Sequence, residues 1–293
     1  MQKITPFLWF DGNAEEAMNF YTSIFKNSKP LDIMRYGEAG PGLKGSVLSA
    51  TFQLDGLELT ALNGGPEFTF TPAESFMVNC ETQKEIEELW GNLTLGGTVL
   101  MELDNYLFSE KFGWVQDKFG LSWQLNLANT KQKIIPFLMF VGEQRGKAEE
   151  AINFYISLFK NSRVVNIEHY GGGEEEPADT VKHAIFSLEG QEFMAVDSNR
   201  AHSFSFSPAV SFFIRCETQE EVDKLWEKLS EGGEKERMGW LKDKYGVSWQ
   251  VVPSILGPML QDKDPEKSKR VMEAMMKMDK MDIVKFKQAY EGQ

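Results

Sequence analysis

The side chains that could carry acid–base chemistry are few, since the 293 residues include only three histidines. His183 lies in the run 181–188 (VKHAIFSL), whose alternation predicts a strand with Val181, His183 and Ile185 on one face. Such a histidine could act as an acid, a base or a hydrogen-bonding group. A surface histidine without a chemical role fits as well, because Ser49 occupies the matching place in an internal repeat.

The other reactive residues fit structural roles. His169 precedes a Tyr-Gly pair, which indicates a basic loop at a pocket rim or a solvated strand end, and His202 lies in a predicted solvent-facing turn. Cys80 and Cys216 each end a predicted strand, so we expect half-buried structural thiols. No Gly-x-Ser-x-Gly elbow or phosphate-binding glycine loop is present in the sequence.

The composition excludes several classes of partner. Asp and Glu number 44 against 31 Lys and Arg, a formal net charge of −13, whereas duplex binding needs clustered cations, so we expect no nucleic-acid partner. No apolar run approaches the roughly 20 residues that cross a bilayer, so we expect no membrane partner. With 42% hydrophobic residues and no apolar signal core at the start, the sequence predicts a soluble cytoplasmic protein.

The chain repeats itself. Residues 4–10 (ITPFLWF) return as 134–140 (IIPFLMF), and the closing run 113–124 (GWVQDKFGLSWQ) returns as 239–250 (GWLKDKYGVSWQ). The helical run AEEAMNFYTSIFKNS likewise returns as AEEAINFYISLFKNS. Because each repeat is too long for a solenoid unit, we expect a compact domain from each. The predicted divisions are 1–130, 131–253 and a C-terminal helical hairpin, 254–293.

Each repeat reads as two strand–helix–three-strand (βαβββ) units. Asn13 and Thr82 are the expected helix caps, and Asp55-Gly56 predicts a two-residue hairpin turn that Glu189-Gly190 replaces in the copy. The strands predicted in the first repeat are 5–10, 31–36, 46–54, 57–62, 75–80, 99–103, 113–116 and 122–127.

These motifs resemble those of PhnB-like proteins in the glyoxalase/bleomycin-resistance/dioxygenase (vicinal oxygen chelate) superfamily. The resemblance rests on the Pro-Phe-Leu-x-Phe strand, the Ala-Glu-Glu-Ala-x-x-Phe-Tyr helix and the closing Asp-Lys-x-Gly-x-Ser-Trp-Gln strand, over 4–128 and 134–252. It implies an α+β fold of two tandem glyoxalase-like domains. Each would pair two βαβββ units in a curved, mostly antiparallel sheet whose concave face holds a ligand or metal, with a C-terminal helical extension.

The resemblance also assigns metal-ligand positions, and this sequence has replaced most of them. Proline offers no donor, hydroxyls are poor ligands for borderline ions, and a divalent ion usually needs three or four protein ligands. Each repeat keeps at most one Glu and one neutral Gln, so we expect no bound metal and no cofactor. The positions are Pro6, Glu58, Ser75 and Gln124, with Pro136, Glu192, Ser211 and Gln250 in the copy.

Similar sequences sometimes carry a demethylubiquinone methyltransferase label. That activity in Rossmann-type enzymes uses a glycine-rich strand–helix turn to hold S-adenosylmethionine, and the sequence has no such turn.

The two repeats differ in one place. Fifteen residues (98–112) lie between the Gly-Gly helix stop and the closing Gly-Trp in the first repeat, but only five (234–238) in the second. We therefore expect the second repeat to be one strand shorter, to lack a lid-like loop and to have a more open concave face.

Aromatic and methionine-rich segments have predicted places too. Alternation directs Trp123 and Trp249 toward the helices and Gln124 and Gln250 toward the concave face, while Trp9 could provide a stacking platform. In the tail, Asp264 and Asp282 are expected helix caps, and a Met-rich stripe would pack against its own domain, a symmetric subunit or varied partners.

We therefore predict a metal-free protein that binds a small organic ligand. The alternative is a metal-dependent lyase, isomerase or dioxygenase of the same superfamily that uses Glu58 or Glu192, and a third reading is an oligomerising scaffold. The sequence leaves open whether a reaction is catalysed and whether two copies form a homodimer. The expected ligand-binding residues are Trp9, Glu58, Gln124, His183, Glu192 and Gln250.

Overall fold

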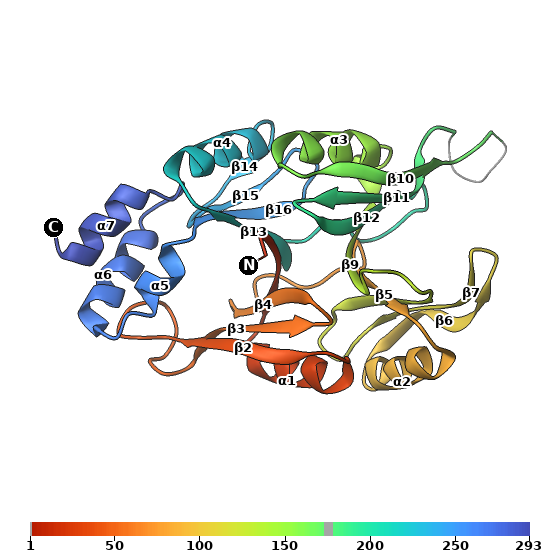
Figure 1. Cartoon of the computed structure of the whole chain (residues 1–293), viewed down its shortest axis with the longest axis horizontal. Coiled ribbons are helices and arrows are strands. Elements are labelled where there is room, and N and C mark those ends of the chain that lie inside the picture. The colour runs from red at the N-terminus through yellow and green to blue at the C-terminus, as the bar shows by residue number, and fades with distance from the viewer. Residues whose placement is uncertain (1, 173–177) are drawn as a thin grey trace.

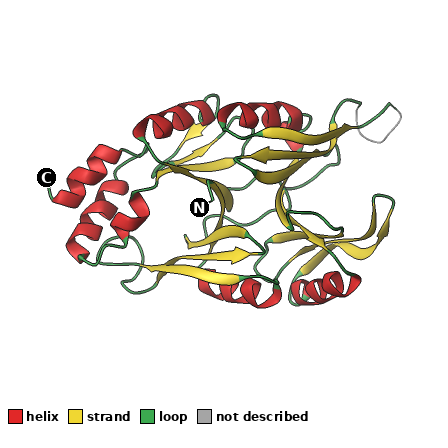
Figure 2. Cartoon of the chain, viewed as in Figure 1, coloured by secondary structure: helices red, strands yellow, loops and turns green. Residues whose placement is uncertain are grey.

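A computed structural model describes residues 2–172 and 178–293. These residues form two eight-stranded mixed sheets, mostly antiparallel, and seven α-helices. In Figure 1 the helices α1 to α4 lie on the outer faces of the two curved sheets, and helices α5 to α7 lie at one end of the molecule. Figure 2 shows the same arrangement by type of element.

The first repeat contains two strand–helix–three-strand units, as the sequence predicts. The first unit comprises β1 (Ile4–Phe10), α1 (Ala14–Ile24), β2 (Lys29–Arg35), β3 (Val47–Leu54) and β4 (Leu57–Asn63). The second comprises β5 (Glu74–Cys80), α2 (Gln83–Thr94), β6 (Thr98–Tyr106), β7 (Ser109–Gln116) and β8 (Ser122–Leu127).

The second repeat follows the same order. Its third unit comprises β9 (Ile134–Phe140), the short 3-10 helix η1 (Gly142–Gln144), α3 (Ala148–Leu158), β10 (Arg163–His169), β11 (Val181–Leu188) and β12 (Gln191–Asp197). The fourth unit comprises β13 (Val210–Cys216), α4 (Gln219–Leu229), β14 (Glu234–Lys235), β15 (Trp240–Lys242) and β16 (Ser248–Pro253).

Each sheet combines one unit from each repeat. Sheet A has the order β14-β15-β16-β13-β1-β4-β3-β2 and joins the fourth unit to the first. Sheet B has the order β10-β11-β12-β9-β5-β8-β7-β6 and joins the third unit to the second. The central junctions are antiparallel, β1 with β13 and β5 with β9. The strands at these junctions lie in the middle of the molecule, between the two sets of helices (Figure 1).

The cores on the helix side follow the repeats instead. One hydrophobic cluster lies mainly under α1 and α2, and the other lies mainly under α3 and α4. Trp123 anchors the first cluster and Trp249 the second, and both are fully buried as predicted. Each sheet therefore contains strands of both repeats, whereas each helix-side core is formed mainly by residues of one repeat.

Local signals place the turns and helix ends. Asp55 and Gly56 have φ values of 43° and 93°, and Glu189 and Gly190 have 50° and 86°, as a two-residue hairpin of type I′ requires. Thr82 caps α2 by accepting a hydrogen bond from the backbone N–H of Glu85.

The cap of α1 differs from the prediction. Asn13 occupies the cap position, but its side chain makes no cap hydrogen bond. Instead the Asn63 Oδ1 atom accepts from the N–H of Ala14 at 2.9 Å, and Asp197 does the same for Ala148 at 3.2 Å in the second repeat. A residue from the last strand of the unit therefore fixes the start of its helix.

The second repeat keeps the strand that we expected it to lose. β14 has two residues and β15 three, against nine and eight in β6 and β7. The ten missing residues therefore shorten both strands of this hairpin rather than delete one.

The tail forms three helices rather than a hairpin: α5 (Leu256–Leu260), α6 (Pro265–Met275) and α7 (Ile283–Glu291). Asp264 and Asp282 cap α6 and α7 as predicted. The apolar side chains of the tail pack on the α4 side of the second repeat, where Val271, Met281 and Phe286 are almost completely buried.

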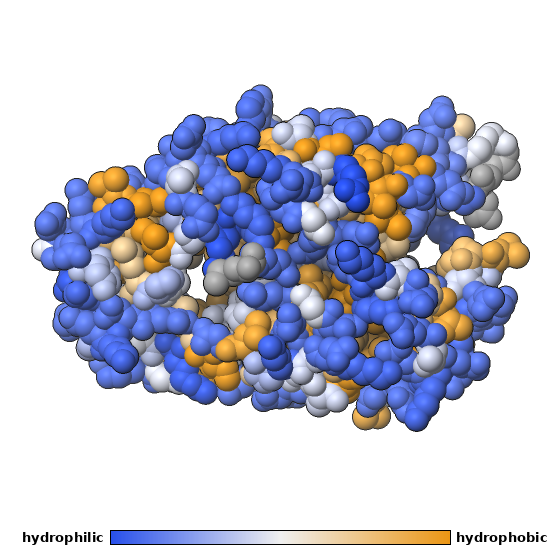
Figure 3. Space-filling model, in the orientation of Figure 1, coloured by the Kyte–Doolittle hydropathy of each residue, from blue (hydrophilic) through white to orange (hydrophobic). Residues whose placement is uncertain are grey.

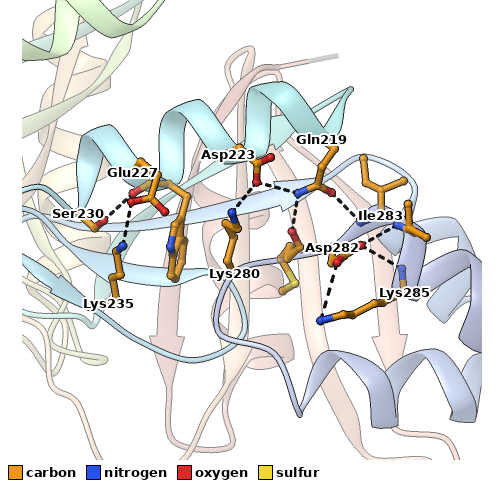
Figure 4. A network of polar contacts seen from close by, with 12 residues as sticks. Gln219, Asp223, Glu227, Ser230, Lys235, Lys280, Asp282, Ile283 and Lys285 are labelled. Carbon is orange, nitrogen blue, oxygen red and sulfur yellow. Dashed lines mark hydrogen bonds and ion pairs between the residues drawn. The ribbon is translucent and has the colours of Figure 1, made fainter.

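Polar contacts join the tail to both ends of sheet A. On α4, Gln219 binds the backbone of Met281 and Ile283, and Asp223 forms an ion pair with Lys280 at 2.7 Å (Figure 4). At the other end, the Gln261 Nε2 atom donates to the Asp32 carboxylate of β2 at 2.6 Å. The tail therefore bridges sheet A from α4 to β2 (Figure 1). No helix of the described residues is long and apolar enough to span a membrane.

Candidate functional site

The concave face of each sheet is the face away from the helices. On β1, Leu8 and Phe10 belong to a helix-side core, so Thr5, Phe7 and Trp9 face the concave side. Pro6 is paired with Phe212, a helix-side core residue, so Pro6 faces the helices. The assignment of Pro6 and Pro136 to the concave face was therefore wrong by one residue.

Sheet A brings three of the predicted residues to one concave face. The strand register places one side chain per strand in a row across the sheet. Gln250 and Glu58 occupy the same row with two strands, β13 and β1, between them, and Trp9 lies further along β1 on the same face. The row reads Trp240, Gln250, Phe213, Thr5, Glu58 and Gln53.

Sheet B brings the other three together. Gln124 and Glu192 occupy its matching row, and His183 lies on the same face of β11. The row reads Trp114, Gln124, Met77, Ile135, Glu192 and Ser187. A site that combines Gln124 with Glu58 and Trp9, as a single repeat would give, is therefore not formed, because Gln124 belongs to sheet B and the other two to sheet A.

The two glutamines are held in place by serines. The Gln124 Nε2 atom donates to Ser75 Oγ at 2.9 Å, and the Gln250 Nε2 atom donates to Ser211 Oγ at 2.9 Å. All four side chains are buried, and among the described residues neither amide oxygen has a hydrogen-bond partner. In each pair, two side chains at positions that the resemblance assigns to metal ligands bind each other. The amide oxygen of the glutamine is then the one neutral acceptor that the pair offers to a ligand.

The remaining groups do not supply a metal site. Glu58 and Glu192 each bind a glutamine side chain through the backbone, Gln2 and Gln132 respectively. The described residues contain no cluster of three or more His, Cys, Asp or Glu side chains that could hold a metal ion. The donor set of either row is a carboxylate and an amide oxygen, and even with His183 on the face of sheet B no group of three His, Cys, Asp or Glu side chains forms among the described residues.

The histidines lie apart from these rows. His183 lies in the strand pair with Glu168, and burial lowers the pKa of its imidazole. Val181 was expected beside His183 but belongs to the helix-side core, because the register of β10 and β11 shifts between Glu168 and His169. His169 itself pairs with Glu149 at 2.8 Å.

The concave face of sheet B is filled by its own side chains. Seven apolar residues form a separate cluster there with relative exposures of 2 to 9%. The long β6–β7 hairpin supplies part of the filling through Phe112 and Tyr106. The buried members are Met77, Phe112, Ile135, Phe137, Met139, Val141 and Met194.

The concave face of sheet A is open by comparison. Phe7, Trp9, Phe213 and Trp240 are all only half-buried. The hairpin of the fourth unit, β14–β15, is too short to fold over them. The predicted more open concave face therefore exists, and it belongs to the sheet that contains this shortened hairpin.

The half-buried aromatic rings on sheet A form one cluster. Phe7 stacks with Phe213 at 6.1 Å between ring centroids and meets Trp240 edge-on at 6.2 Å. Trp9 meets Trp240 at 6.0 Å and Phe68 at 4.9 Å, both edge-on. The indole N–H of Trp9 donates to the carbonyl of Gly65 at 2.7 Å, and a Cβ at Gly64 would lie 2.2 Å from the Trp9 ring. Trp9 is therefore a fixed wall of this cluster rather than a free platform.

The most regular polar network was not predicted from the sequence. In the first repeat, the Asp117 carboxylate accepts from the hydroxyl of Tyr21 at 2.7 Å and from the indole of Trp123 at 2.8 Å. Tyr155, Asp243 and Trp249 repeat this arrangement with the same distances. The Phe-Tyr helix and the Asp-Lys-x-Gly-x-Ser-Trp-Gln strand therefore lock the two units of one repeat together. The recurrence of the tyrosine, aspartate and tryptophan in both repeats is the sequence signal that could have predicted this network.

Burial raises the pKa of the Asp243 carboxyl to about 6 and raises that of Asp117 in the same direction. A third buried carboxyl, Glu74, accepts from the N–H of Ser207 at 2.9 Å and joins β5 to the loop before β13. These acids lie on the helix side, away from the concave faces, so their role is structural.

The comparisons with known proteins agree with this geometry. The family model described as 3-demethylubiquinone-9 3-methyltransferase matches residues 2–126 and again 132–252. The chain belongs to this family. The two matches coincide with the two repeats, and they agree with the resemblance to PhnB-like proteins.

Among solved structures, a PhnB protein from Bacillus cereus is 53% identical, with 43% of this chain covering 100% of that one at a TM-score of 0.41. Glyoxalase I from Zea mays is 14% identical over 84% of this chain and 89% of its own, with a TM-score of 0.56, and shows the likeness of the fold alone. No curated protein sequence matches the chain. The family takes its description from a methyl transfer, but neither mixed sheet is the parallel sheet of a Rossmann-type methyltransferase.

Proposed function

We propose that this chain binds a small organic molecule, without a metal, on the concave face of sheet A. The observation that carries the proposal is the contrast between the half-buried aromatic cluster of sheet A and the filled face of sheet B. Aromatic walls with a few fixed polar groups are typical of small-molecule sites. Here Phe7, Trp9 and Trp240 would supply the walls, and the oxygen of Gln250 would accept a hydrogen bond.

The remaining predicted residues take different places in this proposal. Glu58 lies in the same row as Gln250 and would bind the ligand from the opposite wall. Gln124, His183 and Glu192 lie on sheet B, where the apolar filling leaves them a supporting role.

Fluorine NMR of protein labelled with 5-fluorotryptophan tests the location. The chain has seven tryptophans, and single Trp→Phe variants assign their signals. A screen of aromatic fragments should shift the signals of Trp9 and Trp240. Trp114 is the matched control, because it pairs with Gln124 as Trp240 pairs with Gln250. Fragments that shift only Trp114, or no fragment that shifts either group, would contradict the proposal.

Metal analysis tests the second half of the proposal. Protein purified without chelators should contain far less than one equivalent of nickel, zinc, manganese or iron. A stoichiometric content that disappears in Glu58→Gln would contradict the metal-free site and favour the metal-dependent alternative.

A further inference from the structure

The aromatic cluster of sheet A is bordered by carboxylates. Glu67 directly precedes Phe68, whose ring contacts Trp9. Glu236 is half-buried near Trp240, since its N–H donates to the carbonyl of Trp240 at 2.9 Å. Burial raises the pKa of Glu236, the charge of Lys242 lowers it, and the charges of Glu234 and Glu67 raise it, which places these three side chains near Glu236. Negative charge therefore collects at this edge of the cluster.

A further carboxylate lies on the face itself. Glu58 is half-buried and lies diagonally opposite Phe7 across β1 and β4. Its backbone is bound to Gln2, but within the described part of the chain its carboxylate has neither a hydrogen bond nor an ion pair. A half-buried carboxylate without a partner, next to aromatic rings, is suited to a positively charged ligand group.

The basic side chains near the cluster are already engaged. Lys242, on the same face as Trp240, forms an ion pair with Glu234 at 3.4 Å. Arg215 follows Phe213 on the same face of β13 and has contacts of its own. The carboxylates Glu58, Glu67 and Glu236 therefore outnumber these two basic side chains at the cluster.

Aromatic faces add attraction for the same kind of ligand. The face of an indole or phenyl ring carries negative electrostatic potential and binds ammonium groups within about 6 Å. This wall consists of Trp9, Trp240, Phe7 and Phe213, and within 2–172 and 178–293 no lysine or arginine lies over one of these four rings.

We propose that the molecule bound by sheet A is an organic cation, a protonated or quaternary amine. The amine would lie against the rings of Trp9 and Trp240, with Glu58 as its counter-charge and Gln250 accepting from a donor group of the ligand. This inference rests on the proposed function and specifies the ligand class of the same site.

Matched probes test the charge separately from the site. Choline and its uncharged isostere 3,3-dimethyl-1-butanol have nearly the same shape, so each is titrated into the full chain labelled with 5-fluorotryptophan. Choline should shift the signals of Trp9 and Trp240, and the alcohol should bind about ten-fold more weakly. Glu58→Gln should weaken choline several-fold and leave the alcohol unchanged. Glu192→Gln, the counterpart on sheet B, should change neither.

The outcomes separate the two proposals. If the alcohol shifts Trp9 and Trp240 as strongly as choline does, the site stands and the cationic ligand is disproved. If only the anion 3,3-dimethylbutyrate binds there, the cation is again disproved. If choline shifts Trp114 rather than Trp240, or if Glu58→Gln binds choline unchanged, the assigned position of the amine is wrong.

Discussion

The two concave faces of this molecule descend from the same units, yet one is filled and the other is open. On sheet B, Phe137, Met139 and Met194 are nearly buried. Their counterparts on sheet A are Phe7, Trp9 and Thr60, which are half-buried. The same backbone thus supports an apolar core on one side and an accessible aromatic and polar surface on the other.

The difference follows from the length of one hairpin. β6 and β7 span nine and eight residues and carry Tyr106 and Phe112 onto sheet B, whereas β14 and β15 span two and three. The tip of the long hairpin exposes Leu107 and Phe108. Figure 3 shows apolar surface at the right, where Figure 1 places the β6–β7 hairpin. The ten additional residues of the β6–β7 hairpin therefore determine that the concave face of sheet B, and not that of sheet A, is covered by side chains of its own hairpin.

The largest effect should come from truncating a filled position. We expect Phe137→Ala to lower the free energy of unfolding by about 3–5 kcal/mol, because a buried phenylalanine leaves a cavity. Its counterpart Phe7→Ala should cost only about 1–2 kcal/mol, since Phe7 already contacts solvent. Urea unfolding of both variants measures the difference, and equal losses would show that the two faces are equally packed.

The helix sides of the repeats are near copies, and their buried aspartates should titrate alike. The pKa of Asp243 is about 6 in the fold, against an ordinary 3.8, so the folded state binds the proton more tightly. The free energy of unfolding should therefore fall as the pH rises from about 4 to 6. The full change is about 3 kcal/mol, from 2.2 pK units at 1.36 kcal/mol each.

Asp243→Asn isolates this contribution, because other titrations are common to both proteins. The variant keeps only one acceptor oxygen, so either the Tyr155 and Trp249 pair or the two backbone N–H donors of this carboxylate lose their partner. The stability advantage of the unaltered chain over the variant should shrink as the pH rises from 4 to 7. Asp117→Asn should behave in the same direction. An advantage that grows with pH would show that Asp243 is ionised at low pH.

The smallest effects should come from exchanging matched residues between the faces. Met194→Thr on sheet B should cost about 2 kcal/mol, because it removes buried apolar surface. The reverse exchange, Thr60→Met on sheet A, should change the stability by less than about 0.5 kcal/mol, since the site is half-open. Thermal unfolding compares the two, and a large loss in Thr60→Met would mean that sheet A has no room for a ligand.

Local features of the fold could be predicted from the sequence. The repeat, the order of the strands, the Asp55-Gly56 hairpin and the caps at Thr82 and Asp264 depend on neighbouring residues, and each is present. Alternation also placed Gln124 and Trp123 on opposite faces correctly, because strand periodicity is local.

The long-range partners could not be predicted. Each unit would present the same edge to any other unit, so no periodicity shows that β1 pairs with β13 rather than with β5. For that reason the repeat alone suggests a site that combines Gln124 with Glu58, whereas the structure places them on different sheets. The face of Pro6 was also misassigned, because proline fits either side of a strand and only the pairing with Phe212 decides it.

The crossing of the sheets between repeats has an evolutionary consequence. In an assembly of two identical chains, every substitution appears on both concave faces at once. A change that benefits one face is therefore imposed on the other. Here β1 meets β13 and β5 meets β9 within a single polypeptide, and each position is encoded separately. Because the two copies are joined in one chain, the two concave faces can change independently. One face could be filled by its own side chains while the other stayed open.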